Sequence, residues 1–292
     1  MSLSLRSVLP DHLPLPGLHV NVPPGCANPL CPRPATFWQR WWARNEGIRL
    51  AQEWVCSPEC FRSVLPEHLK QYLYPAAPRE ARPNRIPLGL VLLSQGTITA
   101  DQLKAALAAQ GSAGTGRIGE WLILQGAATE QDILRALAIQ QGCPTFSASE
   151  QQALPAALHF PLSFVESYRA TPVFFSQPQN TLYVGFRDTV LHAFLLALEQ
   201  MFGCNTRPCI IAPALFESIR CRTKEGYEGE TISIEQHQTS RDMSEMITDY
   251  ARQTNAKYCG VIRCGDRLWT RLSDRSGYFV DLLFRVTASA IS

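Results

Sequence analysis

Four cysteines near the start of the chain have the spacing of metal ligands. Cys26 and Cys31 form a C-x4-C pair in CANPLC, and Cys56 and Cys60 form a C-x3-C pair in CSPEC. Zinc prefers four tetrahedral thiolate or imidazole ligands, commonly supplied as two short-spaced pairs. The sequence therefore predicts a structural zinc site at these four residues, with four buried free thiols as the alternative. A site closed by four protein ligands leaves no position for water, so metal catalysis is not expected.

The sequence around the second cysteine pair supports a zinc-finger hypothesis. GIRLAQEWVCSPECF (residues 47–61) resembles treble-clef-like fingers, in which a W-x-C-x3-C knuckle opens a helix. His68 is a candidate substitute ligand, with a solvated helix position as the alternative. Trp38, Trp41 and Trp42 share one helical face, which predicts core packing or, alternatively, an exposed protein-contact face. A module of this size buries little apolar surface, so a metal would supply stabilisation.

A tandem repeat is the second pattern. Pro87 to Gln110 aligns with Arg117 to Gln140 at a constant offset (117 − 87 = 30). Fixed-period self-similarity indicates one supersecondary unit used twice. Each copy predicts a short helix, a glycine turn and a longer helix. Gly96 and Gly126 are placed where the end of the short helix needs a residue in the left-handed conformation. The pairs Thr99/Gln102 and Thr129/Asp132 are placed where a capping box would start the longer helix.

Some residues of the repeat are not explained by the packing of two helical hairpins alone. Gly89 and Gly119 stand near helix starts, where glycine costs stability, and this indicates a close approach by another group. Arg117 places a guanidinium beside a helix N-terminus, which suits an anion. Gln110 and Gln140 end the two apolar stripes with amides.

Here a family resemblance becomes visible. The pattern R-L-G-x2-L-x3-G-x6-L-x3-L-x2-Q, twice in tandem, resembles the N-terminal domain of type II secretion and type IV pilus assembly ATPases, whose ligand-binding members bind cyclic di-GMP. The resemblance covers roughly residues 85–220. PVFFSQPQNTLYVGFRD (residues 172–188) resembles that domain's strand, turn and second strand, and LALEQMFGCNTRPCIIAP resembles its helix followed by an edge strand.

The resemblance implies ligand contacts in both motifs and at one later acidic residue. These positions are Leu88, Gly89, Leu92, Gly96 and Gln110 in the first motif, Arg117, Ile118, Gly119, Leu122, Gly126 and Gln140 in the second, and Asp188. The phosphates would meet Arg117 and the helix starts, and Asp188 would accept hydrogen bonds from a guanine edge.

The first motif departs from the family pattern. Pro87 stands where the family has arginine, and Arg85 lies two positions earlier. Losing one charge-assisted contact costs ~1.5–3 kcal/mol. Two hypotheses therefore stay open: a cyclic di-GMP-binding regulator or adaptor linked to bacterial secretion or pilus machinery, and a nucleotide-independent protein–protein interaction module with a degenerate pocket.

Enzymatic motifs are missing from the sequence. It contains no G-x4-G-K-[ST] phosphate loop, no G-x-S-x-G and no H-E-x-x-H. The C-terminal residues 240–286 resemble the segment that precedes the motor in those ATPases, without its acidic and histidine positions. We therefore expect a non-enzymatic protein. Cys204/Cys209 and Cys259/Cys264 are expected to be buried thiols, with a second zinc site as the alternative.

Composition limits the remaining possibilities. The 292 residues are 46% hydrophobic and 18% charged, with a net charge of +2. This excludes wholesale disorder and does not suggest a general polyanion binder. A third hypothesis, nucleic-acid binding through the zinc head, depends on Arg33, Arg40, Arg44 and Arg49. No apolar run reaches the ~20 residues that span a bilayer, and no secretory signal is evident, so we expect a cytoplasmic protein without membrane insertion.

The predicted fold class is α+β with several domains. The expected division is a Pro-rich segment (1–24), a four-cysteine module (25–74), a linker (75–84), a tandem helical subdomain (85–146), an α/β subdomain (147–224) and a C-terminal α/β piece (225–292).

Overall fold

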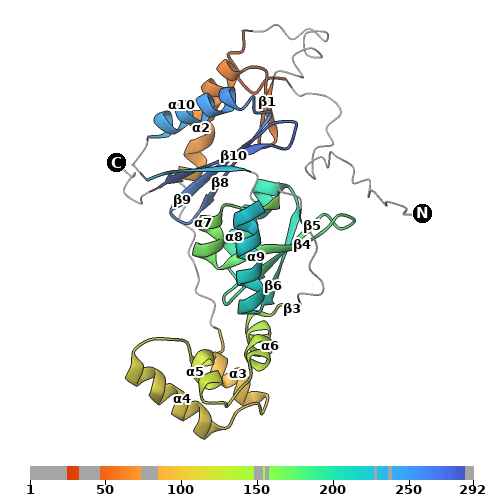
Figure 1. Cartoon of the computed structure of the whole chain (residues 1–292). Coiled ribbons are helices and arrows are strands. Elements are labelled where there is room, and N and C mark those ends of the chain that lie inside the picture. Colours follow the sequence, from red (N-terminus) through yellow and green to blue (C-terminus); the bar gives the residue numbers. More distant parts are fainter. Residues whose placement is uncertain are drawn as a thin grey trace, which may run out of the picture. The chain divides into compact units, whose positions relative to one another are not determined.

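The computed structural model describes residues 25–32, 47–73, 85–147, 154, 158–226, 229–235 and 239–286. The α+β class is confirmed: helices and mixed sheets form two compact units (Figure 1). Unit 1 comprises residues 1–76, 196–204 and 228–292, and unit 2 comprises residues 77–195 and 205–227. The Pro-rich segment 1–24, the linker 75–84 and the Trp38/Trp41/Trp42 face lie outside the described residues. No helix of the described part is both long and apolar enough to cross a membrane.

Unit 1 is built on a mixed six-stranded sheet with the order β2-β1-β8-β9-β10-β7. Its elements are β1 (Ile48–Leu50), β2 (Glu53–Val55), α2 (Pro58–Leu73), β7 (Glu230–Ile234), α10 (Ser240–Gln253), β8 (Tyr258–Cys264), β9 (Arg267–Ser273) and β10 (Phe279–Arg285). The β1–β2 hairpin joins the sheet through parallel pairing of β1 with β8, in the register Arg49↔Tyr258. The cysteine-bearing segment and the C-terminal segment therefore share one sheet.

The helices α2 and α10 pack against each other and complete the core of unit 1. Apolar side chains recur every four residues on α2, at Phe61, Leu65 and Leu69, and all three are fully buried. This spacing places them on one helical face. Arg263 of β8 donates to the carbonyl oxygens of Tyr72 (3.1 Å) and Leu73 (3.0 Å), which are left without partners where α2 ends. The end of α2 is thus tied to the sheet by a side chain 190 residues away.

A buried ion pair crosses two neighbouring strands of this sheet. Arg271 of β9 donates to both carboxylate oxygens of Asp281 of β10, at 2.8 and 2.7 Å. Trp269 Nε1 donates to the same carboxylate at 2.6 Å. The guanidinium also lies over the ring of Phe279, 4.1 Å from its centroid. Asp281 is 0% exposed, so its charge is stabilised by these partners and not by water.

Unit 2 contains a four-stranded sheet with the order β3-β6-β5-β4. Its elements are β3 (Thr145–Phe146), α7 (Leu162–Tyr168), β4 (Ala170–Ser176), β5 (Thr181–Phe186), the start of α8 (His192–Phe202), β6 (Asn205–Ile211) and α9 (Pro213–Gly226). The strands β4 and β5 form a hairpin where the sequence predicts strand, turn and strand, and Asn180 takes a left-handed conformation (φ 47°) just before β5. The expected edge position of β6 is wrong, because β3 pairs with it on the side away from β5.

The tandem repeat folds as two copies of one helix–turn–helix unit. Its helices are α3 (Leu88–Ser94), α4 (Ala100–Ala113), α5 (Ile118–Leu124) and α6 (Glu130–Gln141). Gly96 (φ 69°) and Gly126 (φ 65°) follow the short helices in the left-handed region, as the sequence predicts. Capping boxes start both long helices, at Thr99 with Gln102 and at Thr129 with Asp132. These local signals therefore set the ends of the helices.

The buried ion pair makes a stability prediction. Asp281→Ala should lower the free energy of unfolding of unit 1 by ~3–5 kcal/mol, because it leaves the Arg271 charge buried without its partner. Hydrogen exchange of the β9 and β10 amides at rising urea concentration measures this loss. The double variant Asp281→Leu/Arg271→Met should recover most of it, and Asp249→Ala on the surface of α10 should change it little. Equal stability of Asp281→Ala and Asp249→Ala would contradict the assignment.

Candidate functional site

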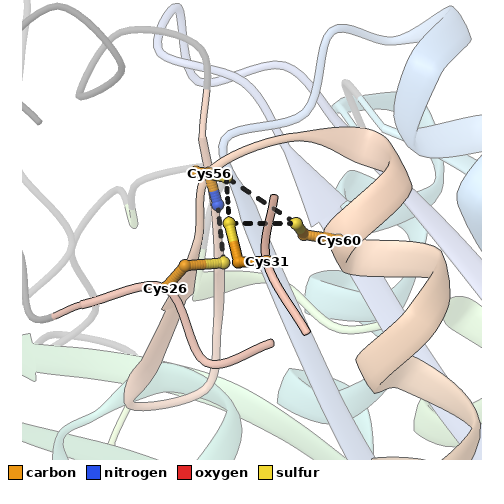
Figure 2. A group of neighbouring side chains, drawn as sticks. All are labelled: Cys26, Cys31, Cys56 and Cys60. Atoms are coloured by element: carbon orange, nitrogen blue, oxygen red, sulfur yellow. Dashed lines mark hydrogen bonds between the residues drawn. The ribbon is translucent and has the colours of Figure 1, made fainter. Parts of the chain in front are cut away.

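The four predicted cysteine ligands come together at one end of the β1–β2 hairpin (Figure 2). Cys56 follows β2 directly, and Cys60 lies in the first turn of α2. Cys26 and Cys31 lie on the 25–32 segment, which is held to the hairpin by a hydrogen bond from Ala27 N to the Trp54 carbonyl oxygen (2.9 Å). A C-x3-C knuckle that opens a helix, with Cys56 before the helix and Cys60 in its first turn, is the arrangement that the resemblance of GIRLAQEWVCSPECF to treble-clef-like fingers implies.

The distances between the sulfur atoms fit a tetrahedral metal. Cys31 Sγ lies 3.5 Å from Cys56 Sγ and 3.7 Å from Cys60 Sγ, and all four sulfurs lie within 4.8 Å of one another. Four thiolates around zinc at about 2.3 Å stand about 3.8 Å apart, whereas a disulfide would need about 2.05 Å. All four cysteines are free. The residues present therefore fit a zinc ion as its complete ligand set.

Asn28 is a member of the cluster that the sequence did not reveal. Its Nδ2 donates to Cys60 Sγ at 3.3 Å, and its Oδ1 accepts from Leu30 N at 3.0 Å. Burial opposes ionisation of Cys60, but hydrogen bonds from Asn28 and Ser57 outweigh it and lower the pKa of this thiol. Burial raises the pKa of Cys26 and of Cys56. A metal must displace protons from the thiols, so its affinity should increase as the pH rises.

The alternative metal ligands are not part of this cluster. His68 lies eight residues beyond Cys60 on α2, about 12 Å along the helix axis, and its Nδ1 contacts Gln71 Nε2 at 3.1 Å. Cys259 and Cys264 are both buried on β8, and their spacing of five residues turns them to opposite faces of the sheet. Within the described ranges, the four cysteines form the one group of side chains that could hold a metal.

The glycines of the tandem motif make close contacts inside the protein. A Cβ atom at Gly89 would lie 2.6 Å from Leu103 Cδ1, and one at Gly119 would lie 3.0 Å from Ile133 Cγ2. Leu103 and Ile133 occupy equivalent places in the two copies. The close approach that the sequence predicts is therefore made by the following long helix of the same copy.

The other apolar motif residues divide into core and surface. Leu92 and Leu122 are 0% exposed and lie in the core of the four tandem helices. Leu88 and Ile118 begin the two short helices and are half-buried. Gly96 and Gly126 lie in exposed turns with open space beside them. Among the apolar residues predicted to contact the ligand, Leu88 and Ile118 are therefore the two with exposed surface to offer it.

The two glutamines tie the copies to each other reciprocally. Gln110 of the first copy donates to the carbonyl oxygen of Gly116, at 2.9 Å, just before the second copy begins. Gln140 of the second copy donates to the carbonyl oxygen of Ile86, at 2.7 Å, just before the first copy begins. The two acceptors are 30 residues apart, which is the offset of the repeat (116 − 86 = 30). Each amide therefore fixes the entry to the short helix of the other copy.

Arg117 and Asp188, predicted to contact the ligand, are paired with each other. Arg117 Nη1 forms an ion pair with Asp188 Oδ1, and Arg169 Nη1 donates to Asp188 Oδ2 at 2.9 Å. The side chain of Arg117 is 50% exposed and that of Asp188 is 18% exposed. Arg117 is the N-cap of α5, whereas Asp188 follows β5, so this carboxylate joins the tandem helices to the α/β part of unit 2.

Two further contacts hold the tandem helices to the same segment. Arg85 Nη2 donates to the carbonyl oxygen of Val190 at 3.0 Å, and Val190 N donates to Gln141 Oε1 at 3.0 Å. Arg85 therefore lies beside the segment that carries Asp188, a residue predicted to contact the ligand. Its guanidinium is hydrogen-bonded to the backbone carbonyl of Val190.

Less than half of the chain is similar to solved structures of other proteins. A solved structure of MshE with cdg (cyclic di-GMP) shares 27% identity, covers 47% of this chain and 99% of that chain, and has a TM-score of 0.40. Two crystal forms of the N-terminal domain of XpsE share 16% and 19% identity, cover 46% of this chain and 92% and 91% of theirs, and have TM-scores of 0.34 and 0.28. No family model and no curated protein matches the chain.

The cysteine cluster predicts the metal content. Purified protein should hold about one zinc per chain, and Cys56→Ser should lose it, because all four ligands are needed. Amide exchange of β8 should then increase, since β1 pairs with β8 beside the site. Cys221→Ser, which replaces an exposed thiol on α9, should keep the metal. Elemental analysis checks this, and retention of zinc by Cys56→Ser would contradict the proposed ligand set.

Proposed function

We propose that the chain is a non-enzymatic cyclic di-GMP-binding regulatory or adaptor protein of type II secretion or type IV pilus machinery in the bacterial cytoplasm. Zinc would serve as its structural ion. The observation that carries the proposal is the tandem motif, folded so that a half-exposed guanidinium at the start of α5 meets a carboxylate from the neighbouring sheet.

The chemistry of these two groups suits a cyclic dinucleotide. Arg117 offers a planar, charged donor for a phosphate, and Asp188 offers acceptor oxygens for the N–H groups of a guanine edge. In the structure the two groups form an ion pair with each other. Binding would replace one ion pair with a phosphate contact and a base contact. Leu88 and Ile118 would supply the apolar surface for the purine faces.

The first motif offers less to a second phosphate than the second motif does. Pro87 precedes α3 and forms no side-chain cap there, and Arg85 donates to Val190. One fewer charge-assisted contact costs ~1.5–3 kcal/mol, or about ten- to a hundred-fold in affinity. We therefore expect this site to bind more weakly than one with arginine in both motifs.

A regulatory or adaptor role is proposed because the chain offers chemistry for binding. The sequence carries no G-x4-G-K-[ST] phosphate loop. The four sulfurs of the cysteine cluster would complete the coordination of a zinc ion and leave no position for water. The cluster then acts on the fold, by fixing the hairpin that supplies β1 to the sheet of unit 1.

A nucleotide-independent interaction module is the second candidate. The observations that favour it are the internal packing at Gly89 and Gly119 and the pairing of Arg117 with Asp188. Because of these contacts, the space beside the two glycines is filled and both charged groups are paired without a ligand. Nucleic-acid binding through the zinc head depends mainly on Arg33, Arg40 and Arg44, which lie outside the described residues.

Calorimetric titration of the full chain with cyclic di-GMP separates these candidates. We expect saturable heat for the wild type and at least about ten-fold weaker binding for Arg117→Ala, because the phosphate loses its guanidinium. Arg135→Ala is the matched control, since Arg135 is an exposed arginine of α6 that pairs only weakly with Asp132, at 3.8 Å. Absence of heat at high micromolar ligand, with partner capture insensitive to Arg117→Ala, would favour the interaction module.

A further inference from the structure

Asp188 is held by two arginines that come from different parts of unit 2. Arg117 takes Oδ1 from the side of the tandem helices, and Arg169 takes Oδ2 from the side of the sheet, at 2.9 Å. The side chain of Arg169 is 40% exposed. Sequence comparison with the tandem motif points to Arg117 but gives no reason to single out Arg169.

The backbone of Arg169 is fixed more firmly than that of an ordinary loop residue. It ends α7 in the left-handed conformation (φ 49°, ψ 42°), which non-glycine residues adopt only where the surroundings enforce it. Its carbonyl oxygen accepts from Arg187 N at 3.0 Å, next to the Ala170↔Phe186 pair of the β4–β5 hairpin. Arg169 and Asp188 thus flank the β4–β5 hairpin at its open end, whereas Arg117 is the N-cap of a short helix of the repeat.

We infer that Arg169 is a positioning residue that aims Asp188 at the base of a bound cyclic dinucleotide. The inference rests on the proposed function. Each carboxylate oxygen has two lone pairs, so Oδ2 can keep Arg169 while other lone pairs accept new donors. When a phosphate binds Arg117, Oδ1 is released, and the hydrogen bond from Arg169 to Oδ2 holds the carboxylate in place for the guanine N–H groups.

This arrangement makes Arg169 a determinant of base selectivity. Guanine presents an N1–H and an amino N–H side by side to a carboxylate, whereas the corresponding edge of adenine presents a ring acceptor next to its amino group. A site built to bind donors rejects an analogue that lacks them, because its polar group is then left without a partner. The phosphate contact at Arg117 is the same for both dinucleotides, so loss of Arg169 should weaken the binding of cyclic di-GMP and not that of cyclic di-AMP.

The test compares cyclic di-GMP with cyclic di-AMP on the full chain. Arg169→Gln should weaken cyclic di-GMP binding about ten-fold, since it disturbs a charged hydrogen-bond acceptor, and should leave cyclic di-AMP binding unchanged. Arg169→Lys should restore part of the discrimination. Arg187→Gln is the matched control, because Arg187 is adjacent to Asp188 in the chain but pairs with Glu217. Asp188→Asn should lose discrimination without any change to α7.

Each outcome decides a specific point. Equal weakening of both dinucleotides by Arg169→Gln, or no change in either, overturns the positioning role while the proposed function stands. If Arg169→Gln fails to fold, full discrimination by Asp188→Asn overturns the inference instead. A wild-type chain that binds neither dinucleotide overturns the proposed function and the inference together.

Discussion

One carboxylate governs the candidate ligand site. Asp188 follows β5 and bonds to Arg117 of the repeat and to Arg169, which ends α7 just before β4. Two residues later, Val190 is bonded through its backbone to Arg85 and Gln141. The short segment from Asp188 to Val190 therefore fixes where the tandem helices meet the α/β part of unit 2. Any anion that binds Arg117 must compete with this carboxylate, so ligand binding and the internal ion pair are coupled.

The two copies of the tandem repeat are held together by equivalent contacts made in both directions. Gln110 and Gln140 each bond to the backbone that leads into the other copy, and Gly89 and Gly119 each admit the apolar side chain of their own long helix. Two copies that exchange equivalent contacts form one core in place of two separate hairpins. A change in one copy is expected to reach the other through these bonds.

In unit 1, long-range contacts join residues 47–73 to the strands of residues 258–285. The cysteine cluster shapes the β1–β2 hairpin, and β1 then pairs with β8 more than 200 residues later (258 − 49 = 209). Arg263 ties the end of α2 to β8, and the Arg271–Asp281 pair links β9 to β10. The proposed zinc site would consequently stabilise strands that lie far from it in sequence.

The sequence predicts those features that depend on local rules. Cysteine spacing, glycine turns and capping boxes act within a few residues, and the structure places all of them as expected. The β1–β8 pairing, the support of Cys60 by Asn28 and the contact of Arg169 with Asp188 were not foreseen. Each of these three contacts joins residues from separate elements, and the periodicity of the sequence cannot predict contacts of that kind. The prediction that β6 is an edge strand is wrong for the same reason, because the two-residue strand β3 pairs with its outer side.

We propose that the tandem motif holds a cyclic dinucleotide. Equilibrium dialysis of the wild-type chain with labelled cyclic di-GMP tests it most directly. We expect saturable binding at one site per chain, displaced by unlabelled cyclic di-GMP and not by GTP. Binding that does not saturate, or that GTP displaces equally well, would contradict it.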